Sequence, residues 1–215
     1  MCAHYESVTD TERLRRFFGV DAPHEDRGTP KQDVWPKAMS VFVHQDTTGA
    51  RLADVGSFGL VPHWATDPSI ARSTYHARSE TVAIKPSFRQ AWAQARRCIV
   101  PAQAIYEPDW SSGRAVATRI GMPSGEPFGI AGLWCNWRGL GGVMLPSFTM
   151  LTVNAIHHPL IRRFHKPVDE KRMVAILRPD QYRHWLTASV EEATWLLYNW
   201  SSPPLEVLDP LLEAC

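Results

Sequence analysis

Short β-like runs separated by glycine and proline are the feature that most constrains how this 215-residue chain can fold. Such runs cover residues 38–45, 52–62, 98–107, 115–122, 127–137, 147–155 and 172–179. Helical patterns lie before, between and after them, at 9–18, 86–97, 179–188 and 189–200. Many short strands with helices inserted among them are typical of α+β proteins. We therefore expect a mostly antiparallel, barrel-like β core with flanking helices, formed as a single domain over residues 1–215.

The predicted helices carry recognisable start signals. Thr9 with Glu12, and Ser189 with Glu192, have the spacing of a capping box, which marks the starts of the first and last helices. Pro86 suits the first position of the helix over 86–97. The apolar stripe of that helix is expected to consist of Phe88, Ala91, Trp92 and Ala95.

The cysteine pattern limits the classes of site that the chain can form. The four cysteines, Cys2, Cys98, Cys135 and Cys215, are scattered without a CxxC pair. This argues against a zinc site and a disulfide framework, so we expect no metal, no cofactor and a reducing compartment. The N-terminal stretch has no apolar signal segment, and no uncharged run approaches the roughly 18 residues of a membrane span. We expect a cytoplasmic protein, associated with the nucleoid in a bacterium, with no membrane contact.

The formal net charge of +1 gives no global attraction to nucleic acid. Binding to phosphates would therefore depend on local clusters of arginine and lysine. Such clusters occur around Arg72 and Arg78, from Arg89 to Arg97, and from Arg162 to Lys166. Each cluster is either part of an anion-binding surface or a solvated face, and the sequence leaves both interpretations open.

Cys2 follows the initiator methionine directly. If Met1 is removed, residue 2 carries an α-amine and a thiol on adjacent carbons. The pKa of an α-amine is about 7.7 to 8.0, so a useful fraction is uncharged at neutral pH. Such an amine can add to an aldehyde to give a Schiff base, and the thiol can then close a five-membered thiazolidine ring. Cys2 could equally attack an amide as an N-terminal nucleophile, or be an incidental second residue.

Three later segments carry polar side chains suited to chemistry. "STYHARSE" places His76, Arg78 and Glu80 on a loop before a predicted helix, where Arg78 could grip a phosphate. In the alternative, Arg78 simply pairs with Glu80. Glu107, at the end of "IVPAQAIYE", suits a general acid or base, or lies at a solvated strand end. His165, before "RMVAIL", is a further candidate base, although a lone histidine is often structural.

Taken in order, several stretches resemble one protein family, the SOS-response-associated peptidase (SRAP) family. These stretches are "MC" at the start, "FGLVPHWATDPSIARSTYHARSETVAIKPSFRQAW", "RRCIVPAQAIYE", "LTVNAIHHPLIRRFHK" and "KRMVAIL". They span most of the chain, and it is their joint order that is specific. The resemblance implies a protein that crosslinks covalently to abasic sites in single-stranded DNA, and thereby shields the lesion from strand cleavage.

The resemblance also implies roles for individual residues. Cys2, exposed by loss of Met1, would form the thiazolidine with the ring-opened sugar aldehyde. Glu107 resembles the family's acid/base glutamate. His165 resembles the histidine that helps to open the deoxyribose ring and serves in reversal. Arg78 resembles a phosphate-binding arginine, and Trp64 an aromatic wedge that stacks on the DNA. Arg72, Arg89 and Arg162 are expected to extend the DNA-binding groove.

The sequence departs from the family pattern in places that bear on the site. His76 stands where the family usually has asparagine, so we expect it to orient the aldehyde oxygen and to add a pH dependence. His4 stands where a phosphate-binding arginine is common. The extra "KPVDE" after His165 leaves His157 or His158 as alternatives for its role.

The family name further implies a peptidase, whose activity would remove Met1 or a propeptide. Two other classes remain open at this point: an N-terminal-nucleophile amidohydrolase acting through Cys2, and a non-catalytic nucleic-acid-binding protein. For the leading hypothesis the partners are single-stranded DNA containing abasic sites and replication-fork proteins, and the protein is expected to be a monomer.

Overall fold

The computed structural model describes residues 3–24, 28–166 and 168–208, and its core is a closed barrel of five strands. These strands are β3 (Met39–Gln45), β4 (Arg51–Phe58), β6 (Arg97–Asp109), β8 (Phe128–Arg138) and β9 (Met144–Asn154). They follow the order β8-β9-β4-β3-β6, and β6 pairs back with β8 to close the barrel. This confirms the predicted α+β class with a mostly antiparallel, barrel-like core.

Shorter strands extend the barrel at its edges. They are β1 (His4–Ser7), β2 (Asp33–Val34), β5 (His76–Arg78), β7 (Val116–Gly121), β10 (Arg172–Val174), β11 (Ile176–Leu177) and β12 (Glu206–Val207). The pairings of β9 with β4 and with β5 are parallel, and the other strand pairings are antiparallel. The 13-residue strand β6 is long enough to close the barrel at one end and to pair with β1 and β7 at the other.

The barrel interior is filled by aromatic rings from three of its strands. The ring centroid of Phe148 lies 5.5 Å from those of Phe42 and Phe58. Tyr5 packs edge-on against Phe58 at 5.3 Å, which ties β1 to this core. Such ring pairs add packing energy to the area that they bury, so the interior is a core and not a pore.

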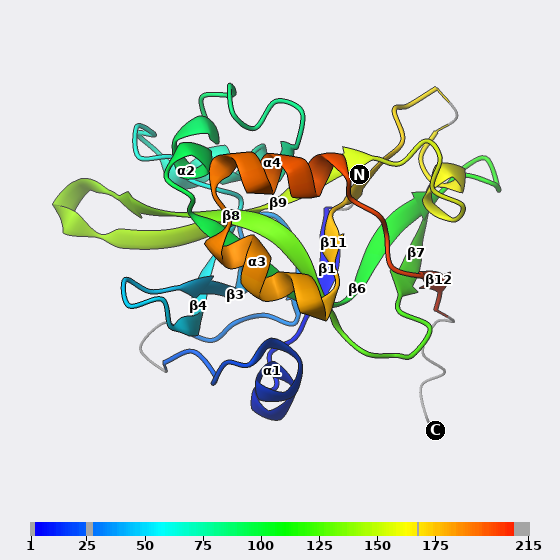
Figure 1. The fold of residues 1–215 in the computed structure, drawn as a ribbon. Helices are drawn as coiled ribbons and strands as arrows, with labels where there is room; N and C mark the ends of the chain where they lie inside the picture. The colour runs from blue at the N-terminus through cyan, green and yellow to red at the C-terminus, as the bar shows by residue number, and fades with distance from the viewer. Residues whose placement is uncertain (1–2, 25–27, 167, 209–215) are drawn as a thin grey trace.

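Helices cover the outside of the barrel. α3 (Tyr182–Thr187) and α4 (Val190–Tyr198) lie across β8 in Figure 1, where they appear in orange. The indole of Trp185 donates to the carbonyl oxygen of Cys98 at 2.9 Å, which anchors α3 to β6. The predicted capping box at Ser189 and Glu192 opens α4.

Two helix predictions need correction. The first helix, α1 (Thr11–Phe18), is capped by Asp10, whose side chain accepts from the amide of Arg13, and not by Thr9. The helix expected over 86–97 is only α2 (Arg89–Ala93), preceded by turns.

The early end of α2 has a local cause. Ala95 has a left-handed backbone (φ 51°), so the chain leaves the helix there and enters β6 at Arg97. Phe88, Ala91 and Trp92 are buried as predicted, whereas Ala95 is exposed.

Among the described residues, no helix has the length and apolar character needed to cross a lipid bilayer.

Candidate active site and nucleic-acid interface

The start of the described chain lies beside the far end of β6. β1 runs antiparallel to β6, with Ser7 opposite Ala102 and His4 opposite Tyr106. Moving along β1 toward the beginning of the chain therefore leads along β6 toward Glu107. The predicted nucleophile Cys2 lies outside the described residues. The strand that follows it nevertheless enters the sheet next to the predicted acid/base glutamate.

Glu107 and His165 form a buried pair at this end of the barrel. His165 Nε2 lies 3.2 Å from Glu107 Oε2, and the two residues are 5% and 1% exposed. The amide of His165 donates to the carbonyl oxygen of Pro108 at 3.1 Å, so the histidine is also tied to β6 through its backbone. Two predicted site residues that lie far apart in the sequence are thus brought into contact.

The environment of His165 favours its neutral form. Burial lowers the pKa of His165 to about 4, and the nearby ammonium group of Lys171 adds to the lowering. His165 Nε2 also lies 3.3 Å from the carbonyl oxygen of Arg172. Because a carbonyl oxygen can only accept, a hydrogen bond there requires the proton on Nε2. At neutral pH His165 is therefore an uncharged imidazole that can accept a proton.

Lys171 holds the turn that presents His165. Its ammonium group donates to three successive carbonyl oxygens, those of Phe164 (3.0 Å), His165 (3.3 Å) and Lys166 (2.6 Å). Lys171 is only 8% exposed, and His165 has a left-handed backbone with φ 66°. That conformation costs about 1 to 2 kcal/mol for a residue other than glycine, so the turn needs support. Lys171 was not predicted from the sequence, because a lysine in a polar segment usually points into solvent.

His76 and Arg78 lie on strand β5, and not on a loop as expected from the sequence. β5 pairs in parallel with β9, placing Arg78 opposite Thr152. Ala77 between them is fully buried, so His76 and Arg78 share the opposite face of the strand. The ring of His76 is half-buried and lies 4.7 Å from the ring of Tyr75.

An ionic network connects β5 to the turn after His165. Arg78 Nη1 pairs with Glu170 Oε2 at 2.9 Å. Glu170 also accepts from Arg172 at 2.6 Å, and Arg172 donates to both carboxylate oxygens of Glu80. Glu80 therefore pairs with Arg172 and not with Arg78, which was the alternative considered from the sequence. Although partial burial acts to raise the pKa of Glu80, the hydrogen bonds from Arg172 keep this pKa below its usual value.

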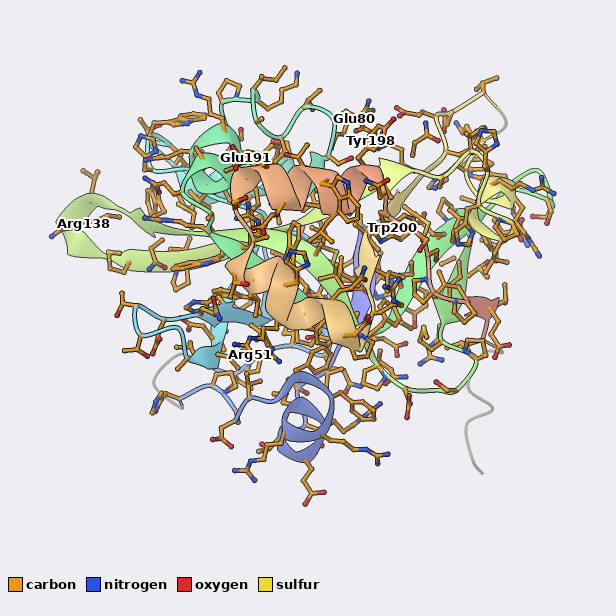
Figure 2. All side chains as sticks on the ribbon, in the orientation of Figure 1. Arg51, Glu80, Arg138, Glu191, Tyr198 and Trp200 are labelled. Atoms are coloured by element: carbon orange, nitrogen blue, oxygen red, sulfur yellow. The ribbon has the colours of Figure 1, made fainter. Side chains whose placement is uncertain are left out.

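Glu80 also lies at the edge of a second feature. It lines a pocket of about 500 Å³ together with Tyr198 and Trp200, and Figure 2 shows Glu80 close to Tyr198 at the end of α4. A neighbouring groove of about 980 Å³ contains Trp200, His157 and His158.

Of the three histidines considered for the acid/base role, His165 is the one beside Glu107. His158 Nδ1 accepts from the amides of Leu160 and Ile161 at 3.2 and 3.0 Å, which stabilises the turn there. Burial lowers the pKa of His158 as well. His157 lies in the 980 Å³ groove.

A stack of three rings surrounds His4. The ring of His4 lies between those of Trp35 (4.2 Å, 13°) and Tyr106 (4.0 Å, 6°), and its Nε2 contacts the carboxylate of Asp33. The hydroxyl of Tyr106 donates in turn to Glu6. His4 is therefore held between two rings. This stack was not predicted from the sequence, because His4 and Trp35 meet only through the pairing of β1 with β2.

A charged pair extends this arrangement outward. Arg119 donates to both carboxylate oxygens of Glu6 at 2.7 Å. Burial raises the pKa of Tyr106 to about 12, and the hydrogen bond to Glu6 contributes.

The remaining predicted DNA-binding residues lie on other surface segments. Trp64, in the loop after β4, is about half exposed, and its indole donates to the carbonyl oxygen of Pro86 at 3.2 Å. Arg72 ends the 3₁₀ helix η2 (Pro68–Arg72), Arg89 begins α2, and Arg162 lies in η4 (Ile161–Arg163). All three arginines are exposed. Their role in DNA binding stays a prediction.

Comparison with known proteins agrees with the resemblance noted in the sequence. The family model described as "SOS response associated peptidase (SRAP)" matches residues 1–208. "Abasic site processing protein YobE" of Bacillus subtilis is 28% identical over 200 residues, covering 91% of this chain and 86% of that protein. "Abasic site processing protein YoaM" of the same organism is 32% identical over 185 residues, covering 85% and 74%. A solved structure of a Bordetella bronchiseptica protein matches with a TM-score of 0.85 and 40% identity, covering 95% of this chain and 97% of that one.

Proposed function

Because the chain belongs to the SOS response associated peptidase family, we propose that it captures abasic sites in single-stranded DNA by a covalent bond through Cys2. The observation that carries this proposal is the buried Glu107–His165 pair at the end of β6, beside the strand that follows Cys2. Curated relatives over most of the chain are named abasic site processing proteins, which supports an abasic site as the target.

The proposed chemistry begins when Met1 is removed, which is the role assigned here to peptidase activity. The α-amine of Cys2 adds to the C1′ aldehyde of the open sugar, and the resulting carbinolamine loses water to give an imine. The thiol then adds to the imine carbon and closes the thiazolidine, while its proton passes to the nitrogen. One water molecule leaves in total, and no oxidant, reductant or metal is required.

Glu107 and His165 are assigned the proton transfers of this sequence. Opening the sugar ring needs a base for the C1′ hydroxyl and an acid for the ring oxygen. Neutral His165 carries its proton on Nε2, which lies 3.2 Å from Glu107, so it can donate that proton to the Glu107 carboxylate while Nδ1 takes up another. The same pair can protonate the hydroxyl that leaves as water from the carbinolamine.

His76 is assigned a hydrogen bond to the aldehyde oxygen, in place of the asparagine amide usual in the family. It shares a strand with Arg78, which would contact the adjacent phosphate. H76N tests this assignment. An equal crosslinking rate and an equal pH profile in H76N and the parent protein would exclude a role for the imidazole.

DNA binding is assigned to exposed cations and aromatic rings, with Arg78 and Trp64 nearest to the family pattern. Arg72, Arg89 and Arg162 are the further exposed candidates. The predicted contact from His4 needs correction, because its imidazole lies between the rings of Trp35 and Tyr106 and contacts Asp33, so His4 is not an exposed cation. Because such contacts release counterions from the phosphates, affinity should fall steeply as salt rises.

The decisive experiment incubates the purified protein with a single-stranded oligonucleotide that contains one abasic site, followed by denaturing electrophoresis and mass spectrometry. A shifted band with the summed mass of protein without Met1 and DNA, less one water, is expected. C2A should abolish this band while reversible binding remains, and E107Q and H165A should slow its formation. H157A is the matched control, because His157 lies in a separate groove. Retained Met1, or DNA released unmodified, would contradict the proposal.

A further inference from the structure

An open hollow of about 740 Å³ lies on the outer side of the ring stack around His4. Trp35 and Pro36 form part of its wall, together with Lys31, Asp33 and Lys37. Trp35 is 52% exposed, which is unusual for so large an apolar side chain. The inner face of its indole is covered by His4, so the exposed part belongs to the side that lines the hollow.

Trp35 is held rigidly before any ligand arrives. Its indole stacks on His4, which stacks on Tyr106 and contacts Asp33. The backbone around it is also anchored, because the amide of Lys37 donates to the carbonyl oxygen of Phe58 at 2.6 Å. A ring that is already ordered loses little conformational entropy when a second flat ring stacks on it.

The charges around the hollow favour a phosphate. Lys31 and Lys37 are both exposed and line it. Asp33 is the acidic residue among the lining residues, and its carboxylate contacts His4. An exposed indole in a hollow that two lysines also line matches a nucleotide, in which a flat base and an anionic phosphate lie within one repeat.

We propose that this hollow is a binding subsite for one nucleotide of single-stranded DNA, with its base stacked on Trp35 and a phosphate beside Lys31 or Lys37. The assignment rests on the proposed function, and it places this nucleotide close to the lesion, because His4 follows Cys2 by two residues. Since stacking does not distinguish bases, the subsite would accept any sequence next to the abasic site.

The test measures the affinity of the full-length protein for an undamaged, fluorescently labelled oligothymidine by anisotropy. W35A should weaken binding by about 5- to 150-fold, the range typical of losing one stacked base, and W35F should retain most of the affinity. W195A is the matched control, because Trp195 is 63% exposed on α4 and takes no part in the ring stack. Circular dichroism on each variant establishes that the fold is intact.

The lysines are tested through salt dependence. The double variant K31Q/K37Q should reduce the slope of log affinity against log salt by about 1 for each phosphate that a lysine no longer neutralises. R183Q on α3 is the control and should leave this slope unchanged. Parental affinity in folded W35A, or an unchanged slope in the lysine variant, would overturn the subsite. If the parent protein itself does not bind single-stranded DNA, the proposed function fails first and the subsite with it.

Discussion

Replacing Lys171 by methionine tests how the protein holds His165 beside Glu107. The ammonium group of Lys171 supplies the three hydrogen bonds to the carbonyl oxygens of residues 164–166. Methionine has a similar length and can occupy the same space without donating. The substitution therefore removes the donors and leaves the packing largely intact.

The expected loss of stability follows from burial. A hydrogen bond from a charged donor contributes about 1.5 to 3 kcal/mol. Water can replace the bond to exposed Lys166, so the buried carbonyl groups of Phe164 and His165 determine the cost. Burial of the apolar methionine side chain stabilises the folded state by about 1 to 2 kcal/mol, which offsets part of this loss. We therefore expect K171M to lose about 1 to 5 kcal/mol of unfolding free energy, or roughly 2 to 20 °C in melting temperature.

The effect on capture should be larger than the effect on binding. Without Lys171 the left-handed turn at His165 can relax to a negative φ, which carries the imidazole away from Glu107. A displacement of about 1 Å at a catalytic group can reduce a rate about 100-fold. Arg78 and Trp64 keep their positions, so the dissociation constant for undamaged single-stranded DNA should stay within about twofold of the parent value.

The assay compares crosslinking rates at saturating DNA, well below the melting temperature of the variant. K166M is the matched control, because Lys166 is exposed on the same turn and its Nζ lies 4.8 Å from the ring of Trp110. Its stability should change by about 0.5 to 1 kcal/mol. A K171M protein that crosslinks at the parental rate would show that the turn is held without Lys171 and would refute this reasoning.

The other predictions concern charge and backbone geometry. Because burial lowers the pKa of His165 to about 4, the unfolded chain takes up a proton first as pH falls. The contribution of His165 to the unfolding free energy is fully present above about pH 6.5, and up to about 3 kcal/mol of it is lost as pH falls toward 4. H165N should lack this pH dependence in urea unfolding at several pH values. E170Q should strengthen binding to undamaged single-stranded DNA a few-fold, because it weakens the pair that occupies Arg78; weaker binding would show that Glu170 orients Arg78 instead. G59A should destabilise the protein by more than about 3 kcal/mol in thermal unfolding, since a Cβ there would lie 2.1 Å from the carbonyl oxygen of Ala71. G49A, where the same atom meets nothing within 4 Å, is its control, and equal losses would refute the steric argument.

The barrel could be predicted from the sequence because its strands are long and carry their own apolar patterns. β8 and β9 each run for 11 residues, and both were expected within a few residues of their observed bounds. β1 and β5 were missed, since they have four and three residues and exist only through pairing with β6 and β9. Strands this short have no periodicity of their own to detect.

The residues of the candidate site divide in the same way, into those that a sequence pattern indicates and those that only folding brings together. Glu107 and His165 could be chosen as candidates from the sequence because both lie in stretches that resemble a family, and the structure adds that they touch. Lys171 and Trp35 were not found, because their importance lies in contacts with residues brought near by folding. In "DEKRM" nothing in the sequence distinguishes a buried lysine from an exposed one. The burial of Lys171 becomes evident only in the fold, where it contacts the turn around His165.

The site divides into a buried part and an exposed part, and the two respond differently to the solvent. Glu107 and His165 are almost fully buried, so mobile ions screen their interaction little. Arg78 and Glu170 are about half exposed, and an exposed pair of this kind contributes only about 0.2 to 1 kcal/mol. A phosphate can displace Glu170 at small cost, whereas the geometry of the Glu107–His165 pair stays fixed by the barrel and by Lys171. Under the proposed function, phosphate binding at Arg78 is therefore adjustable at the surface without disturbing the groups assigned to the chemistry.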